Sequence, residues 1–157
     1  MGQKGDSHHF RHADGSGGAK RENGDCHLFA PWIHLEFDIP RLGRRVDAVL
    51  VTSTAVIPIE FKVGAKKFQQ ADYEQAWDYG LDLKNFHAPS HAAAIFPILC
   101  ATDAPKSDRR WKPPHADGVR PPFCCNAAGL GPAIALALDG VEKGDSHHFP
   151  PFPRRKW

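Results

Sequence analysis

Two short apolar runs, separated by a polar turn, stand out between residues 45 and 63. Residues 46–51 are apolar except for Asp47, and the valines among them are typical of a largely buried strand. The polar residues 52–54 that follow have the length of a hairpin connection. Residues 55–63 are again mostly apolar. The pattern therefore predicts two neighbouring antiparallel strands.

The second predicted strand carries its polar residues on one face. With a period of two, Glu60 and Lys62 share a face, and in an antiparallel hairpin Asp47 can lie across from Glu60. Charged groups inside such strands destabilise the fold if they are unpaired, and a bound cation would remove that cost. The alternative is an ion pair of Lys62 with Glu60 or Asp47 at a sheet edge. Pro58 lacks a backbone donor, which predicts a bulge or a local edge.

A helix is predicted directly after these strands. The segment from Lys66 to Phe86 has no proline, and its apolar residues recur at helical spacing. Gln75 and Tyr79 are four residues apart, so they lie on one face of this helix beside the apolar stripe. An aspartate, then Glu-x-Lys, then a Gln-x-x-x-Tyr helix is a far more specific pattern than any of its parts.

Further elements are predicted in the second half of the chain. Residues 92–100 form a strand candidate that a proline interrupts, and residues 123–125 form a last short strand. Between them, residues 105–122 contain many prolines and charges, which predicts a loop. Asn126 is predicted to cap a helical segment that continues to Leu138.

This ordered set of residues resembles the PD-(D/E)XK nuclease superfamily, in particular its RecB-like branch with a Q-x-x-x-Y helix. Asp47 matches the "D", Glu60-Phe61-Lys62 matches "(D/E)XK", and Gln75-Ala-Trp-Asp-Tyr79 matches the trailing motif. Longer segments are similar to the nuclease-like N-terminal domain that precedes a P-loop ATPase or helicase domain in some bacterial proteins. These segments are LEFDIPRLGRRVDAVL, IEFKVG, QAWDYGLDLKNFH, PILCATDAP and CNAAGLGPAIA, and they cover about Trp32 to Leu138.

The resemblance implies an α/β fold with a restriction-endonuclease-like core. Its central mixed sheet would be flanked by helices in the order αβββαβ. The first helix is expected to be missing or degenerate, because residues 1–31 contain no convincing helical pattern. The expected nuclease-like domain covers residues 32–139, with a flexible Gly/His-rich tail at 1–31 and a flexible, basic, Pro-rich tail at 140–157.

The same resemblance assigns roles to these residues. Asp47 and Glu60 would bind Mg²⁺ or Mn²⁺ together with the backbone carbonyl of Phe61. Lys62 would orient the attacking water and stabilise the charge that develops on the phosphate. The glutamine and tyrosine of the helix would brace the site or touch the nucleic-acid backbone. The expected function is metal-dependent hydrolysis of phosphodiester bonds in DNA, at ends, flaps or single strands.

Charge is compatible with a nucleic-acid partner. The net charge of +2 and the pI near 8.4 are compatible with DNA binding but do not by themselves indicate it. Two basic pairs, Arg44 with Arg45 and Lys66 with Lys67, bracket the proposed site and are the predicted DNA contacts. Another basic cluster, at 109–112, is interpreted as a solvated face. No G-x-x-x-x-G-K-[ST] motif occurs, so the ATPase that follows in the similar proteins is expected to be missing here. The resemblance implies an ATPase or helicase as a separate partner.

Two alternatives to an enzyme remain open. The domain is then a non-catalytic nucleic-acid-binding or regulatory module of an ATPase or helicase system, or a truncated, inactive relic. The cysteines show no C-x-x-C spacing, which predicts free thiols in a reducing cytoplasm. Neither a signal peptide nor an apolar run of membrane-spanning length is present, so a cytoplasmic location without a membrane partner is expected.

A histidine-containing segment occurs twice in the chain. KGDSHHF at Lys4–Phe10 returns at Lys143–Phe149. Aspartate and paired histidines can bind Zn²⁺ or Ni²⁺. The Gly-rich setting offers no preorganised geometry, however, so flexible tails are expected in preference to a chelating site.

Overall fold

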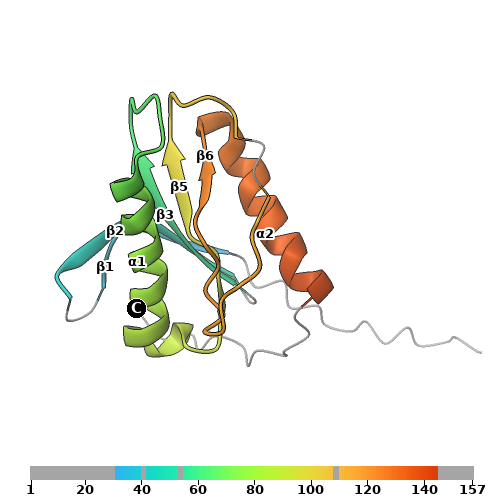
Figure 1. The fold of residues 1–157 in the computed structure, drawn as a ribbon. Coiled ribbons are helices and arrows are strands. Elements are labelled where there is room, and N and C mark those ends of the chain that lie inside the picture. The colour runs from blue at the N-terminus through green and yellow to red at the C-terminus, as the bar shows by residue number, and fades with distance from the viewer. Residues whose placement is uncertain (1–30, 40–41, 53–54, 108–109, 145–157) are drawn as a thin grey trace, which may run out of the picture.

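The computed structural model of the protein describes residues 31–39, 42–52, 55–107 and 110–144. These residues are built around one mixed sheet (Figure 1). In these residues the sheet has six strands: β1 (Trp32–Ile39), β2 (Arg44–Val51), β3 (Ala55–Lys62), β4 (Ala94–Ile95), β5 (Ile98–Ala101) and β6 (Phe123–Cys125). The described helices are α1 (Gln70–Phe86) and α2 (Leu130–Gly144), with short 3-10 turns at Ala88–Ser90 and Ala127–Gly129.

The strand order explains why the sheet is mixed. The order is β1-β2-β3-β5-β6, and β4 pairs with β3 as well. Strands β1, β2 and β3 pair antiparallel, whereas β5 joins β3, and β6 joins β5, in parallel. A parallel neighbour needs a crossover, and α1 lies in the connection from β3 to β5. The predicted α/β class with a central mixed sheet is confirmed.

The two helices cover opposite faces of the sheet. Ile57 of β3 belongs to the apolar cluster that contains Ala137 of α2, whereas Val56 belongs to the cluster that contains Leu83 of α1. Successive side chains of a strand point to opposite faces, so these clusters lie on the two sides of the sheet. Figure 1 shows α1 and α2 on either side of β3, β5 and β6.

Pro58 produces no bulge between β2 and β3, because Val49 lies opposite it in an unbroken register. The irregularity is on the other side of β3. Val56 pairs there with Ile95 of β4, and the pairing resumes three residues later on both strands, at the start of β5. This register puts Pro97 at the level of Pro58. The local edge that the sequence predicts is therefore a short break in the parallel ladder at Pro58, which has no backbone N–H to donate to the neighbouring strand.

Helix α1 begins at Gln70, later than the predicted start at Lys66. The intervening loop is bound to the segment that follows β5. Gly64 N donates to Thr102 Oγ1 over 2.8 Å, and Asp103 N donates to the carbonyl oxygen of Ala65 over 3.1 Å. Gly64 has a φ of +76°, a conformation that interrupts a helix and suits glycine. These contacts hold the loop in a non-helical conformation.

The later elements follow the predicted order. The strand candidate at 92–100 is divided into β4 and β5, and β6 occupies the predicted residues 123–125. The Asn126 side chain accepts from Gly129 N over 2.9 Å and so caps the 3-10 turn that leads into α2. Helix α2 continues to Gly144, beyond the predicted boundary at residue 139.

Several expectations concern parts of the chain outside the described residues. These are the missing first helix, the tail at 1–30, the first KGDSHHF copy and most of the second, and Cys26. Cys100, Cys124 and Cys125 are buried, and they form no disulfide within the described residues. In the described part of the chain, no helix combines the length and the apolar character needed to cross a membrane.

Gly80 sets the distance between α1 and the sheet. A Cβ atom there would lie 2.7 Å from Pro97 Cγ and 3.1 Å from Val119 Cγ1, both on buried side chains. We expect Gly80→Ala to lower the free energy of unfolding by about 1–2 kcal/mol, because the clash outweighs the gain in helix propensity. Chemical denaturation measures the change.

Gly140 of α2 is the matched control, since a Cβ there meets nothing within 4 Å. We expect Gly140→Ala to raise the free energy of unfolding by about 0.5–1 kcal/mol through helix propensity alone. Equal stabilisation by both substitutions would show that α1 does not pack this closely on the sheet.

Candidate active site

Backbone pairing between β2 and β3 ends next to Asp47, and the Asp47 side chain hydrogen-bonds to the backbone of β3 instead. The backbone pairing ends at Ala48 opposite Ile59. One residue further, Asp47 Oδ2 accepts from the backbone N–H of Phe61 over 2.8 Å. The N–H and C=O of a strand residue point to the same side, so the Phe61 carbonyl also faces β2. Asp47 and the Phe61 backbone thereby lie together where the two strands diverge.

Glu60 and Lys62 share the face of β3 that α1 covers. Lys62 Nζ lies 2.9 Å from Glu60 Oε1, and the Glu60 side chain is only 6% exposed. Burial raises the pKa of the Glu60 carboxyl above its ordinary value. The hydrogen bond from Lys62 opposes this rise, whereas the negative charge of Asp47 adds to it. The two carboxylates are therefore close enough to repel each other, as the predicted register requires.

Glu60 has an oxygen that nothing in the described structure satisfies. Its Oε2 atom is buried and has no hydrogen-bond partner there. Asp47 is the neighbouring acidic group, and two ionised carboxylates cannot satisfy each other, because both only accept hydrogen bonds. The raised pKa of Glu60 favours its protonated form, which could donate to Asp47 when no cation is bound. A buried, unpaired carboxylate oxygen beside a second carboxylate is strongly unfavourable. A cation between them would satisfy both.

A chain of hydrogen bonds connects Lys62 to α1. Its Nζ atom donates to Gln75 Oε1 over 3.0 Å, and Gln75 Nε2 donates to the hydroxyl of Tyr79 over 2.7 Å. Tyr79 is buried in the apolar cluster beneath α1. The glutamine and the tyrosine of the trailing motif thus face the same site as Glu60. The glutamine binds Lys62 directly, and the tyrosine binds the glutamine.

Asp72 belongs to the same cluster and was not predicted from the sequence. It lies in the first turn of α1, and its Oδ1 atom is 3.5 Å from Lys62 Nζ. Burial alone would lower the pKa of Lys62, but Glu60 and Asp72 together raise it above its ordinary value. Its spacing in the sequence could have indicated this position, because Asp72 precedes Gln75 by three residues and therefore lies on the same face of the helix.

The predicted DNA contacts differ in their surroundings. Arg44 Nη1 lies 3.0 Å from Asp78 Oδ2 of α1, and Arg45 Nε lies 2.7 Å from Glu36 Oε2 of β1. Both arginines are thus already engaged by carboxylates. Lys66 and Lys67 are exposed in the loop between β3 and α1, next to the end of β3 that carries Lys62.

The donor set suits a small, hard cation better than a softer metal. It consists of two carboxylates and one backbone carbonyl, and Mg²⁺ commonly binds through one or two carboxylates while keeping several waters. In the described ranges, no group of three or more His, Cys, Asp or Glu side chains is placed to hold a metal ion. Binding by Asp47 and Glu60 would therefore rely on water and phosphate oxygens for the remaining positions.

Comparisons of the chain with models of protein families, with curated proteins and with solved structures gave no match.

Proposed function

We propose that the protein is a metal-dependent nuclease with a restriction-endonuclease-like core, which hydrolyses phosphodiester bonds in DNA. The observation that supports this most directly is the buried Glu60 carboxylate, whose Oε2 atom lacks a partner and whose neighbour is the carboxylate of Asp47. A purely structural ion pair would need one carboxylate for Lys62. The second carboxylate and the unsatisfied oxygen are explained by a cation.

In this proposal the acidic residues bind the cation, and the cation promotes the reaction. Asp47, Glu60 and the Phe61 carbonyl would hold Mg²⁺ or Mn²⁺ where β2 and β3 diverge. The bound cation would activate a water molecule and offset the charge that develops on the phosphate. Hydrolysis forms a bond from water to phosphorus and breaks the bond from phosphorus to a sugar oxygen, which leaves with a proton.

Lys62 would act as a fixed positive charge in this reaction. Its ammonium group lies beside the carboxylates of Glu60 and Asp72, which favour the charged form. Its bonds to Glu60 and Gln75 hold the ammonium group beside the proposed cation site. A preorganised charge in this position stabilises the transition state more than the ground state.

The substrate would approach from the end of β3. Lys66 and Lys67 are exposed on the loop there, and they are better placed to meet phosphates than the two arginines that already contact carboxylates. An ATPase or helicase partner, which the resemblance implies, would deliver DNA to this loop.

Metal dependence tests the proposal. We expect Mg²⁺ or Mn²⁺ to support cleavage of labelled duplex, flap or single-stranded DNA, followed on denaturing gels. Ca²⁺ should support binding with little cleavage, because it accepts oxygen ligands but has looser geometry. EDTA should abolish cleavage.

The alternative function is a non-catalytic nucleic-acid-binding module. It is favoured by the finding that, among the described residues, no three His, Cys, Asp or Glu side chains are placed to hold a metal ion together. Salt-dependent DNA binding without cleavage in any of these metals, and unchanged by Asp47→Asn or Glu60→Gln, would establish the module and reject the enzyme.

A further inference from the structure

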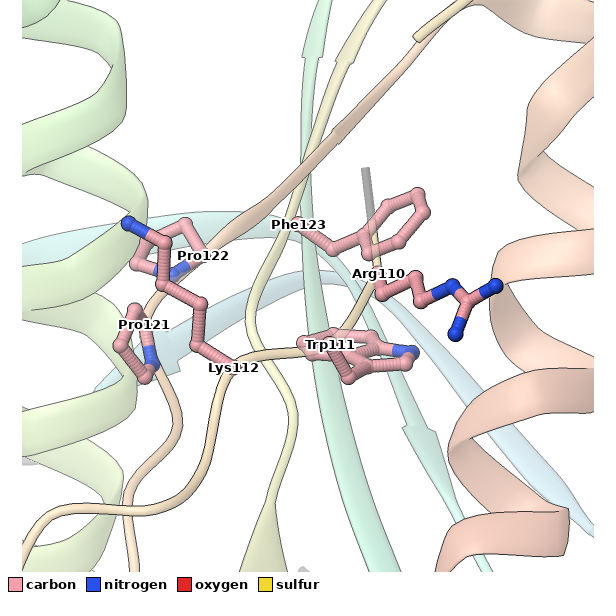
Figure 2. A pocket seen from close by; sticks show the side chains of 6 residues that line it. All are labelled: Arg110, Trp111, Lys112, Pro121, Pro122 and Phe123. Atoms are coloured by element: carbon pink, nitrogen blue, oxygen red, sulfur yellow. The ribbon is translucent and has the colours of Figure 1, made fainter. Parts of the chain in front are cut away.

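A second site lies at the β6 edge of the sheet, two strands away from β3 (Figure 2). It is a hollow of about 370 Å³ between the segments 110–112 and 121–123. Its lining residues are Arg110, Trp111, Lys112, Pro121, Pro122 and Phe123. The volume falls in the lower part of the range of roughly 300–1,000 Å³ found for small-ligand pockets.

The aromatic part of this hollow is held rigidly. Trp111 Nε1 donates to the carbonyl oxygen of Ala133 in α2 over 3.3 Å. The indole ring meets Phe96 edge-on with 5.1 Å between centroids, and it meets Phe123 with 5.0 Å between centroids. Phe96 and Phe123 are buried, whereas Trp111 is only partly buried. The indole is thus a fixed aromatic surface that a ligand can reach.

Positive charge surrounds this surface. Figure 2 shows Arg110 on the side of Trp111 and Phe123, and Lys112 on the side of the two prolines. Both are exposed, and the six lining residues include no acid. Arg120 adds a third cation nearby, since it donates to the Lys112 carbonyl over 2.9 Å and lies over the Phe96 ring. The same bond fixes the backbone beside Trp111.

We propose that this pocket binds one nucleotide of a single-stranded nucleic acid. The base stacks on Trp111, and the flanking phosphates contact Arg110 and Lys112. Stacking on a fixed aromatic ring between cations is how proteins hold single strands without reading their sequence. In a duplex the bases are stacked on one another, so their flat faces are not available to the indole. The proposal goes beyond the metal site, because it uses other residues and requires no cleavage.

Fluorescence anisotropy with a labelled oligothymidylate, in EDTA and with the full chain, tests this inference. We expect Trp111→Leu to weaken binding about tenfold or more, and Trp111→Phe to restore most of the loss. Arg110→Ala and Lys112→Ala should each weaken binding and lower the slope of log K against log salt by about 0.7, because each removes one phosphate contact. Lys106→Ala is the matched control, since this lysine is exposed but does not line the pocket.

The outcome separates this site from the proposed nuclease site. Wild-type affinity in Arg110→Ala and Lys112→Ala would overturn the proposal, and these exposed side chains can be changed even if Trp111→Leu does not fold. An equal loss in Lys106→Ala, or equal affinity for a blunt duplex of the same length, would also overturn it. Because EDTA is present throughout, a failure here leaves the cleavage test unaffected, and a failure of cleavage leaves this test unaffected.

Discussion

Glu60→Gln is expected to abolish metal-dependent cleavage, with a loss of about 100-fold or more in kcat. The amide keeps the size of the side chain and an oxygen for Lys62, but it removes the charge that would bind the cation. Calorimetric titration with Mn²⁺ gives a second readout, and we expect binding to weaken at least about tenfold. The thermal midpoint should stay unchanged or rise, since burial already disfavours the ionised Glu60 carboxyl and raises its pKa.

Glu74→Gln is the matched control for this substitution. Glu74 is exposed on α1 and accepts a hydrogen bond from Gln70, so it has the same chemistry without access to the site. We expect wild-type cleavage and Mn²⁺ binding from it. If Glu60→Gln also retained both, the unsatisfied Oε2 atom would need another explanation and the cation site would be wrong.

Lys62→Met should lower kcat by about 100-fold or more while leaving Mn²⁺ binding intact or tighter. Methionine keeps much of the side-chain volume but removes the charge. Metal binding should not suffer, because Lys62 repels the cation that the carboxylates attract. The loss should appear in kcat and leave KM for DNA nearly unchanged, since the charge acts mainly in the transition state. Single-turnover kinetics at saturating Mg²⁺ separates the two parameters.

Lys106→Met controls for the lost positive charge, because Lys106 is exposed in the segment after β5. Lys62→Arg should restore little activity, as a planar guanidinium does not match the positions of Glu60, Asp72 and Gln75 around one ammonium group. A wild-type kcat in Lys62→Met would leave this lysine with a structural role only.

The sequence predicted β2, β3 and their register well, because the physical signal there is simple. Period-two alternation placed Glu60 and Lys62 on one face, and one polar residue inside an apolar strand marked Asp47. The helix face shared by Gln75 and Tyr79 followed from their spacing in the same way. These residues come together in the structure because each lies on a regular element.

Other features depend on tertiary contacts that the pattern does not contain. The sequence pattern does not indicate β1, because most of its residues are exposed on both faces and so show no apolar alternation. Its backbone is also irregular, since Glu36 has a φ of +52°. The late start of α1 depends on Thr102, which is distant from Gly64 in the sequence but accepts a hydrogen bond from its backbone N–H. The ion pairs of Arg44 with Asp78 and Arg45 with Glu36 likewise join separate elements.

Pro58 and Pro97 lie at the same level of neighbouring strands, but their backbones face different partners. The carbonyls of Val56 and Lys62 accept from Phe96 N and Thr102 N, so the even-numbered residues of β3, Pro58 included, face β5. Phe123 N donates to the Pro97 carbonyl, so the backbone of Pro97 faces β6 instead. Each proline therefore lacks its N–H at a different seam of the sheet. A slip of β3 by one residue would turn Glu60 away from α1, because alternate residues face opposite sides, so the register of this strand decides whether the acidic residue meets the helix.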